Sequence, residues 1–563
     1  MEKLLHKSET ILGNFAVTIL NKPFTCPDGI IHSNTAQVDF FDIRGKKINV
    51  VEYGYQTREE LFKLIDSQNL NLNYCYVNNF SLSEYLKISH LSANEPVPFL
   101  TFSAKNSFFD CDHTTDFSFV VFQATKISFE STIFGDGFVN FTGAKFGDST
   151  VSFRRTRFGD GTIDFRFAEF GEGNLSFHYS HFGLGDVSFV NTNFGNSNVD
   201  FQSTTFGDGN IDFKYAKFGK GDISFEKTIF GNGKKDFKAV EFGEGKVDFK
   251  RVQFNNGDIS FEGAEFGVGK ISFRLSTFGK GHISFEMADF RKADVSFEKV
   301  EFASGRVTFR DAKADQITFK ACQLDAYFDF KFSQCNFLDL SETIIRDVID
   351  FLSDDLKTNI QTLNFSGMKN FGRIIIDWKD NDVKAIIYNQ KETSFRQKAN
   401  QFRILKEEFH NAGKYNDEDR AYVEFKRCEQ KAHLQVDLKD RPFNALWAYP
   451  LYFFKWLIFD KMGRYATNPL RVILSMSIVY SLFSILYFVI PLVSSAHLVS
   501  ANALPDANSL AVSFYYSAVT FFTIGYGDYY ALGILRVVAV LEGFVGVFLM
   551  SYFTVAFVRK ILR

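Results

Sequence analysis

The sequence is poor in cysteine, nearly balanced in charge and without a continuous hydrophobic run at its N-terminus. None of its six cysteines stands in a C-x-x-C pair or at a regular spacing, which excludes a disulfide framework and a zinc site and favours a reduced, cytosolic setting. A formal net charge of -3 gives no reason to expect nucleic acid as a partner. Residues 1–18 lack the apolar core of a signal peptide, so we expect the N-terminal part to stay in the cytosol. The cysteines are Cys26, Cys75, Cys111, Cys322, Cys335 and Cys428.

Phenylalanine is the residue in excess, with 71 copies, and it carries an internal repeat. Two series of phenylalanines recur every twelve residues without a missing position: the first runs from Phe122 to Phe302 and the second from Phe117 to Phe309. Two positions before the first series the residue is mostly small or β-branched, and two before the second it is almost always Val, Ile or Leu. Because side chains at i and i+2 of an extended segment share a face, we expect both pairs to point inward.

This alternation of five- and seven-residue intervals predicts a β-solenoid. Its small-x-Phe boxes resemble the pentapeptide-repeat family, with two residues added at every second corner. Two phenylalanine rings do not fit inside a twelve-residue coil, so we predict a right-handed quadrilateral coil of about 24 residues, with phenylalanine columns inside. Gly-x-Gly sequences such as Gly159–Gly161 and Gly171–Gly173 are expected to mark corners with positive φ. Lys235 is the charged exception at a position that otherwise holds mostly Val or Ile.

The solenoid pattern is expected over residues 101–380, with degenerate closing coils after Phe319. Residues 1–100 are the least regular. Gln37–Phe40 and Ile48–Val51 are predicted as short strands, and Thr57 with Glu60 predicts the start of a helix. We expect this mixed region to cap the open end of the solenoid.

Residues 394–437 change to helical spacing and predict a cytosolic helical hairpin. The hairpin either couples the solenoid to the membrane part or is a solvated spacer. Residues 442–460 are rich in aromatic side chains and are interrupted by Pro450. This segment predicts an interfacial helix along the inner leaflet rather than a third membrane span.

The last part of the chain, residues 470–563, contains two apolar runs that are each long enough to cross a bilayer, Val472–Ile490 and Val537–Val558. Between them lies Thr520-Phe-Phe-Thr-Ile-Gly-Tyr-Gly-Asp528. Non-helical backbone survives at membrane depth only where it lines a watery cavity or is buried in protein. The glycines at 525 and 527 let the backbone turn successive carbonyls toward one axis. Lysines and arginines flank one end of each run and are missing from residues 491–509, which predicts cytosolic termini.

This stretch resembles the selectivity filter of potassium channels, and the helices around it resemble their two-transmembrane pore module. The resemblance implies a homotetramer in which the carbonyls of Thr523, Ile524, Gly525 and Tyr526, with the Thr523 hydroxyl, form stacked K⁺ sites, and Gly527 completes the filter. It also implies a multi-pass protein of a prokaryotic plasma (inner) membrane, surrounded by lipid. K⁺ is then the permeant ion, and no cofactor is expected.

Several residues are predicted to support the filter. The Tyr526 ring is expected to point away from the axis and to pack on Tyr515 or Tyr516, although these two tyrosines could equally face lipid. Phe522 and Val519 depart from the commonest pattern, which has a second threonine and, in some members, a glutamate at these places. The supporting residues are Thr520, Asp528, Tyr515, Tyr516 and Glu542.

Glu542 is the only acidic or basic residue inside the second apolar run. An intramembrane carboxyl has to face protein or water, so Glu542 either holds the back of the filter, senses pH or is a neutral hydrogen-bonding group. Gly543 and Gly546 are candidates for the hinge of an inner gate, and close helix packing explains them equally well.

Neither apolar run has arginines at three-residue intervals, which argues against steep voltage gating. We therefore predict a potassium-selective channel gated from the cytosolic side by the solenoid, with an unidentified cytosolic protein or small molecule as regulator. The alternative is a membrane-anchored solenoid scaffold for protein partners, with a non-conducting or non-selective pore. An enzyme is not expected, because polar residues such as Asp164 and Ser176 are spread along the repeat and do not cluster at one level.

Overall fold

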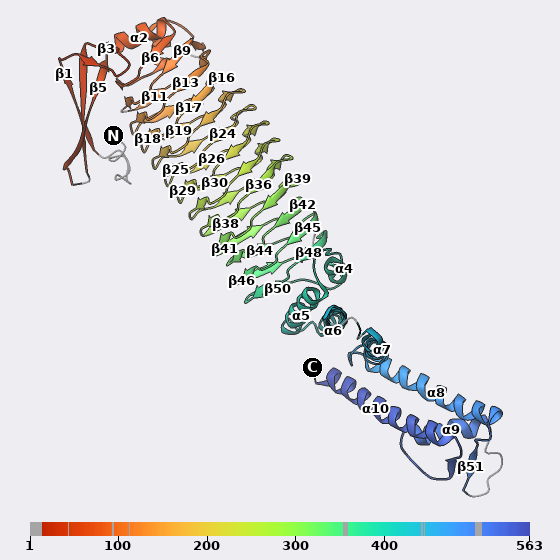
Figure 1. Ribbon diagram of the computed structural model, residues 1–563. Coiled ribbons are helices and arrows are strands. Elements are labelled where there is room, and N and C mark those ends of the chain that lie inside the picture. The colour runs from red at the N-terminus through yellow and green to blue at the C-terminus, as the bar shows by residue number, and fades with distance from the viewer. Residues whose placement is uncertain are drawn as a thin grey trace. The chain divides into compact units, whose positions relative to one another are not determined.

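The computed structural model describes residues 14–562 except 43, 93–94, 112, 353–357, 441–442, 444 and 502–508. The chain divides into two compact units, Met1–Lys391 and Glu392–Arg563. Short parallel strands dominate the first unit, and helices dominate the second (Figure 1).

Parallel strands with a 24-residue register build the first unit. One coil consists of β14 (Ile133–Phe134), β15 (Phe138–Asn140), β16 (Lys145–Gly147) and β17 (Thr150–Ser152). The next coil places β18 (Arg157–Phe158), β19 (Ile163–Asp164), β20 (Glu169–Phe170) and β21 (Leu175–Ser176) beside them. Val139 pairs with Ile163, which in turn pairs with Val187, so equivalent residues are stacked. The predicted coil of about 24 residues is confirmed, whereas its handedness and quadrilateral outline stay predictions.

The column that contains β15 runs from β11 (Thr114–Asp116) to β50 (Arg373–Ile375) through 12 described strands. At about 4.8 Å for each step between strands, the column is roughly 50 Å long. After its last strand, the short helix α4 (Val383–Tyr388) packs against β48 (Ile360–Asn364).

Phenylalanine rings fill the inside of the coils. Phe141 stacks on Phe165, one coil further on, with ring centroids 4.8 Å apart and planes within 1°. Phe153, half a coil away, meets Phe165 edge to face at 5.7 Å. All three side chains are fully buried. Burial of each ring is worth about 1.5–3 kcal/mol, so the repeat supplies a continuous hydrophobic core along the column.

The Gly-x-Gly corners are glycine for a reason other than the one predicted. Gly159, Gly161, Gly171 and Gly173 do not have positive φ, so that expectation was wrong. They lie instead against the backbone of the preceding coil, where a Cβ on Gly161 would come within 2.1 Å of a carbonyl oxygen. The close approach of stacked backbones therefore requires glycine here. Polar side chains between the glycines also connect neighbouring coils. Asp160 Oδ1 accepts a hydrogen bond from the backbone N–H of Leu184, one coil further on, at 2.9 Å.

Positive φ occurs at a different corner, two residues after each second-series phenylalanine. Phe167 and Tyr179 both have φ of 58°, and both side chains are more than half exposed. Their N–H groups point along the column, and that of Phe167 donates to the carbonyl of Val190 at 3.1 Å. The left-handed conformation thus keeps the ladder between coils continuous at the cost of local strain.

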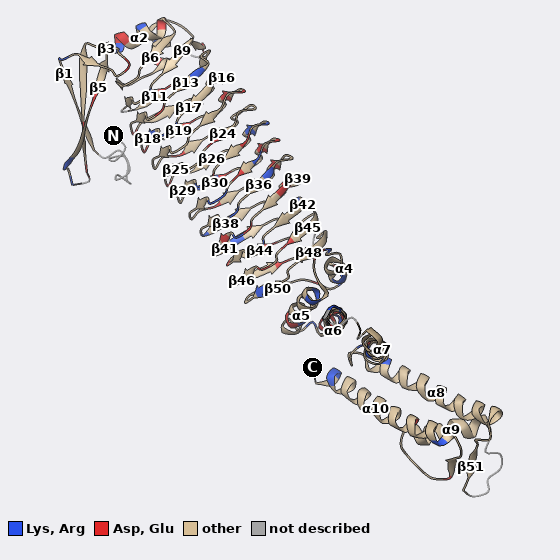
Figure 2. Ribbon diagram, viewed as in Figure 1, with Lys and Arg blue, Asp and Glu red and all other residues tan. Residues whose placement is uncertain are grey.

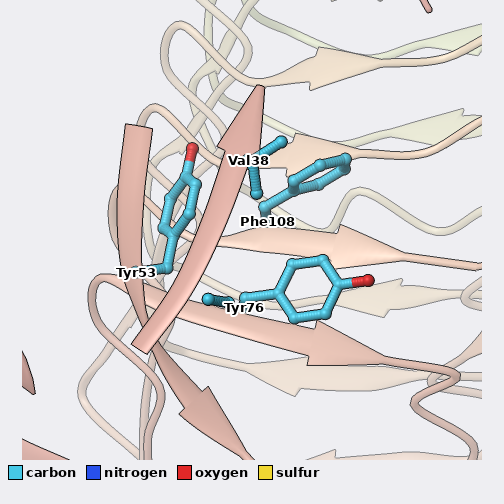
Figure 3. Close-up of a cluster of buried hydrophobic side chains, with 5 residues drawn as sticks. Val38, Tyr53, Tyr76 and Phe108 are labelled. Atoms are coloured by element: carbon cyan, nitrogen blue, oxygen red, sulfur yellow. The ribbon is translucent and has the colours of Figure 1, made fainter. Parts of the chain in front are cut away.

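The N-terminal region continues the solenoid sheet. Strands β1 (Phe15–Leu20), β4 (Asn34–Phe41) and β5 (Lys47–Gln56) pair antiparallel, and β5 then pairs in parallel with β7 (Cys75–Asn78). Val38, Tyr53, Tyr76 and Phe108 pack together where the two patterns meet (Figure 3). Thr57 and Glu60 form the predicted capping box of α2 (Arg58–Asp66). The remaining elements here include β2 (Phe24–Thr25), β3 (Ile31–His32), β6 (Asn69–Asn71) and α3 (Leu82–Ile88).

The second unit begins with two helices packed on each other, α5 (Phe395–Asn411) and α6 (Tyr415–Asp440). A helical segment made of α7 (Ala445–Lys455) and the π-helix η2 (Trp456–Lys461) precedes the apolar part. Within the described residues, two helices are long and apolar enough to cross a membrane, α8 (Pro469–Val493) and α10 (Leu535–Ile561). Figure 2 shows almost no charge along these two helices and basic residues at the end of α10. Helix α9 (Leu510–Phe521) and the hairpin of β51 (Leu498–Ser500) with β52 (Tyr529–Ala531) lie between them in sequence.

Lys235 is buried among apolar residues, as the repeat predicts. It stands between Ile211 and Ile259 in the stacked column and is fully inaccessible. Its Nζ donates to the carbonyl oxygen of Asn256 at 2.7 Å. Burial lowers the pKa of Lys235 to about 8, although Asp208 and Asp258 act in the opposite direction. The charged form is therefore disfavoured inside the solenoid.

Replacing Lys235 with isoleucine is expected to raise the thermal unfolding midpoint of the full-length protein at pH 7. A pKa lowered from 10.5 to about 8 corresponds to a penalty on the order of 3 kcal/mol while the lysine is charged. Between these two pH values the unfolded chain keeps the proton and the folded chain does not. Wild-type stability should therefore rise with pH in this window, and the advantage of Lys235→Ile should shrink.

The matched control is Lys220→Ile, because that side chain is 70% exposed and its ion pair with Glu244 spans 3.8 Å. This control should leave the midpoint nearly unchanged. An equal gain for Lys235→Ile at pH 7 and pH 10.5 would contradict the assignment of the penalty to the buried charge.

Candidate functional site

The segment after α9 is a loop with left-handed backbone at every second residue. Thr523, Gly525 and Gly527 have φ of 55°, 66° and 74°. An added Cβ on either glycine would meet nothing within 4 Å, so the backbone conformation, rather than lack of space, favours glycine there. Alternation of left-handed and ordinary residues can turn successive carbonyls toward the same side. This is the backbone geometry that a column of oxygen ligands needs.

The end of α9 fixes the start of this loop. The N–H of Thr523 donates to the carbonyl of Thr520 at 3.1 Å, and the N–H of Ile524 donates to that of Val519 at 2.9 Å. The Thr523 hydroxyl donates to the carbonyl of Phe522 at 2.7 Å. The C-terminal turn of the helix, which carries partial negative charge, therefore lies directly beside the loop.

A hydrogen bond from α9 holds the far end of the loop. Tyr515 Oη donates to Asp528 Oδ2 at 2.8 Å, and its ring meets Tyr529 edge to face at 6.1 Å. The backbone of Asp528 accepts a bond from Ala501 at 2.8 Å, next to the β51–β52 hairpin. Helix α9 therefore holds loop residues 523–527 at both ends, through its C-terminal carbonyls at the start and through Tyr515 at the end.

The predicted packing of Tyr526 is not made within the chain. The Tyr526 side chain is 71% exposed, and no ring contact joins it to Tyr515 or Tyr516 in the part of the chain that the structure describes. Tyr516 instead packs edge to face on Tyr487 of α8, with centroids 5.0 Å apart. The two helix tyrosines are therefore occupied by other partners, and the outer surface of the loop remains uncovered in a single chain.

Glu542 lies on α10 behind α9 and is fully buried. Its Oε1 accepts a hydrogen bond from Ser517 Oγ of α9. The hydroxyl of Tyr487 on α8 lies within hydrogen-bonding range of the same carboxyl group. Ser513 Oγ of α9 is also buried, and it has no hydrogen-bond partner among the described residues. A small polar layer thus joins α8, α9 and α10 inside an otherwise apolar bundle, where polar groups are costly unless they serve structure or function.

The two glycines on α10 have different surroundings. A Cβ on Gly546 would come within 2.1 Å of the carbonyl oxygen of Phe521, the last residue of α9. Gly543 has open space around it. Close packing against α9 therefore accounts for Gly546, and its role as a hinge stays a prediction, as does that of Gly543.

Sequence reasoning selected Glu542 but missed its neighbours. Ser513 and Ser517 are four residues apart in an otherwise apolar helix, a spacing that places both on one face. That spacing could have indicated that the two serines share a polar site. The sequence around Tyr487 gave no such indication, because a tyrosine in an apolar run is also typical of a lipid-facing or core position.

Residues 475–563 match the family model described as ion channel. The match covers most of α8 and all of α9, the loop and α10. Comparisons with curated proteins and with solved structures gave no match.

Substitution of Glu542 separates a hydrogen-bonding role from a role of its charge. Glu542→Gln keeps a group that accepts from Ser517, so we expect the thermal midpoint of the purified protein to stay close to that of the wild type. Glu542→Ala removes the acceptor and is expected to destabilise the bundle by about 1–3 kcal/mol, the cost of leaving a buried polar group unsatisfied. Equal destabilisation by both variants would contradict the interpretation of Glu542 as a neutral hydrogen-bonding group. It would indicate instead that a carboxyl group is required.

Proposed function

From the premise that residues 475–563 form an ion-channel domain of the two-transmembrane type, joined to a β-solenoid, we propose that the protein is a potassium-selective channel with a homotetrameric pore. The observation that carries this proposal is the loop at residues 523–527. Its left-handed residues alternate at 523, 525 and 527, and its sequence offers carbonyls and one threonine hydroxyl as ligands. Oxygens of this kind replace the hydration shell of K⁺ in selective pores. Conduction through such a site is passive.

Exposure of the loop in one chain supports the homotetramer. Ile524 and Tyr526 are 49% and 71% exposed, although both follow a buried helix end. On α10, Val540 and Phe544 are more than 70% exposed. One chain supplies only one side of an ion site, and four copies around an axis complete the rings of oxygen. In this proposal, neighbouring copies also cover the exposed ring of Tyr526.

Basic residues support an orientation with both termini in the cytosol. Lys461, Arg464 and Arg471 surround the start of α8, and Arg559 and Lys560 end α10. Basic residues favour the cytosolic side, which supports our proposal that the solenoid and the α5–α6 hairpin lie in the cytosol, with the helices in a plasma (inner) membrane. Helix α7 exposes large aromatic side chains, with Trp447 at 78%, which suits the lipid boundary.

Gating is assigned to the cytosolic side and not to voltage. Neither α8 nor α10 has a row of arginines that could move in the membrane field. The solenoid is the largest element of the chain, and it would receive a cytosolic protein or small molecule as regulator.

Potassium flux into liposomes that contain the purified protein tests this function. Gly525→Ala and Gly527→Ala should each lower K⁺ flux at least tenfold. Alanine at positive φ costs about 1–2 kcal/mol in each copy, and four copies share one pore. Gly45→Ala is the matched control, because Gly45 has φ of 73° and open space around it, like the two loop glycines, but lies between β4 and β5 in the N-terminal region; this variant should conduct normally.

Unchanged flux in both filter variants would contradict the assignment of the loop as the ion pathway. The alternative function, a membrane-anchored solenoid scaffold for protein partners, would then be favoured.

A further inference from the structure

Three elements of the second unit meet in one cluster of ion pairs and hydrogen bonds, which we name the α6 junction. It joins α6 to the segment before α8 and to the C-terminal end of α10. Its residues are Asp419 and Arg427 on α6, Asp460 on η2, and Tyr552, Arg559 and Lys560 on α10.

The first side of the junction connects α6 with the end of α10. Lys560 Nζ lies 2.9 Å from Asp419 Oδ2, and Arg559 Nη2 lies 3.2 Å from Asp419 Oδ1. The Asp419 side chain is only 10% exposed. The Arg559 guanidinium also lies 4.2 Å from the ring centroid of Tyr422, one turn further along α6. Because the carboxylate is nearly buried and has two basic partners, this contact constrains the geometry more than a fully exposed pair would.

The second side connects α6 with the segment before α8. Arg427 binds Asp460 through two parallel bonds, Nη2 to Oδ1 at 2.7 Å and Nε to Oδ2 at 3.0 Å. Its remaining nitrogen reaches Glu424 at 2.8 Å. The Asp460 side chain is 5% exposed. A two-pronged arginine–carboxylate pair fixes both distance and orientation.

The third side connects α10 with the same segment before α8. Tyr552 Oη donates to the carbonyl of Phe459 at 3.1 Å and accepts from the N–H of Ala466 at 3.0 Å. The turn beneath it is strained, since Arg464, Tyr465 and Ala466 all have positive φ. A left-handed conformation at three successive non-glycine residues persists only when surrounding contacts impose it.

We propose that the α6 junction is the element that couples the cytosolic hairpin to the pore, so that a displacement of α6 moves the end of α10. The three sides form a closed triangle, and no one element can shift without breaking or carrying along another. In a pore lined by four copies of α10, the position of that end sets the width of the cytosolic opening. This inference rests on the proposed channel function and goes beyond it by naming the residues of the coupling.

The coupling is tested by removing the charge of Asp419, then the charges of its partners Arg559 and Lys560, and then all three together. The variants are Asp419→Asn, the double variant Arg559→Gln with Lys560→Gln, and the combined triple variant. Open probability is measured on the full-length protein in planar bilayers. Each change should shift open probability at least about fivefold in the same direction, and the triple variant should match the others because all three remove the same contact.

Arg403→Gln is the matched control, because the Arg403–Glu407 pair lies within α5 and both side chains are at least half exposed. It should leave open probability unchanged. Amide hydrogen exchange gives a readout that does not depend on conduction: Asp419→Asn should speed exchange in the last turns of α10, and Arg403→Gln should not.

Additive effects of the separate changes, or open probabilities equal to that of the wild type, would overturn the coupling. A wild-type protein that carries no K⁺ flux would instead overturn the proposed function, and the coupling would fall with it. The two failures are distinguishable, because the first leaves wild-type conduction intact.

Discussion

A potassium ion leaves water only where oxygen atoms replace its hydration shell, and in this chain the candidate oxygens belong to a loop that is neither helix nor strand. Such a loop is tolerated at membrane depth only with firm support. The support comes from α9, which holds the loop at its start through the carbonyls of Val519 and Thr520 and at its end through the Tyr515–Asp528 bond. Helix α10 supports α9 in turn, because Gly546 lets it approach Phe521 and Glu542 binds Ser517.

The solenoid depends on the same two features, close backbone approach and a few unusual φ values, in a different setting. Its coils are close enough that the Gly-x-Gly corners leave no room for a Cβ, and its other corners need left-handed residues to keep the hydrogen bonds between coils. The phenylalanine columns and the stacked parallel sheets join each coil to its neighbours.

Much of this could be predicted from the sequence. The period of the phenylalanines predicted the length of the coil, because two rings do not fit into twelve residues. The glycines at 525 and 527 predicted the non-helical loop between the two apolar helices. The reason for glycine at Gly161 could not be predicted, because the clash involves a carbonyl 24 residues earlier and exists only after the coils stack. Positive φ at Phe167 had no signal, since the residue type at that corner varies from repeat to repeat. The partner of Glu542 is 25 residues away and that of Asp419 is 141 residues away. Both contacts depend on how the helices are rotated and packed, which a local sequence pattern does not encode.

The most direct measurement of the central claim is the reversal potential of the full-length protein in a planar bilayer, with K⁺ on one side and Na⁺ on the other. If the loop at 523–527 strips and replaces the water shell of K⁺, the current should reverse at a strongly displaced voltage, of the sign that K⁺ permeation alone would produce. A reversal potential near zero would mean that both ions pass equally well, and it would contradict the account.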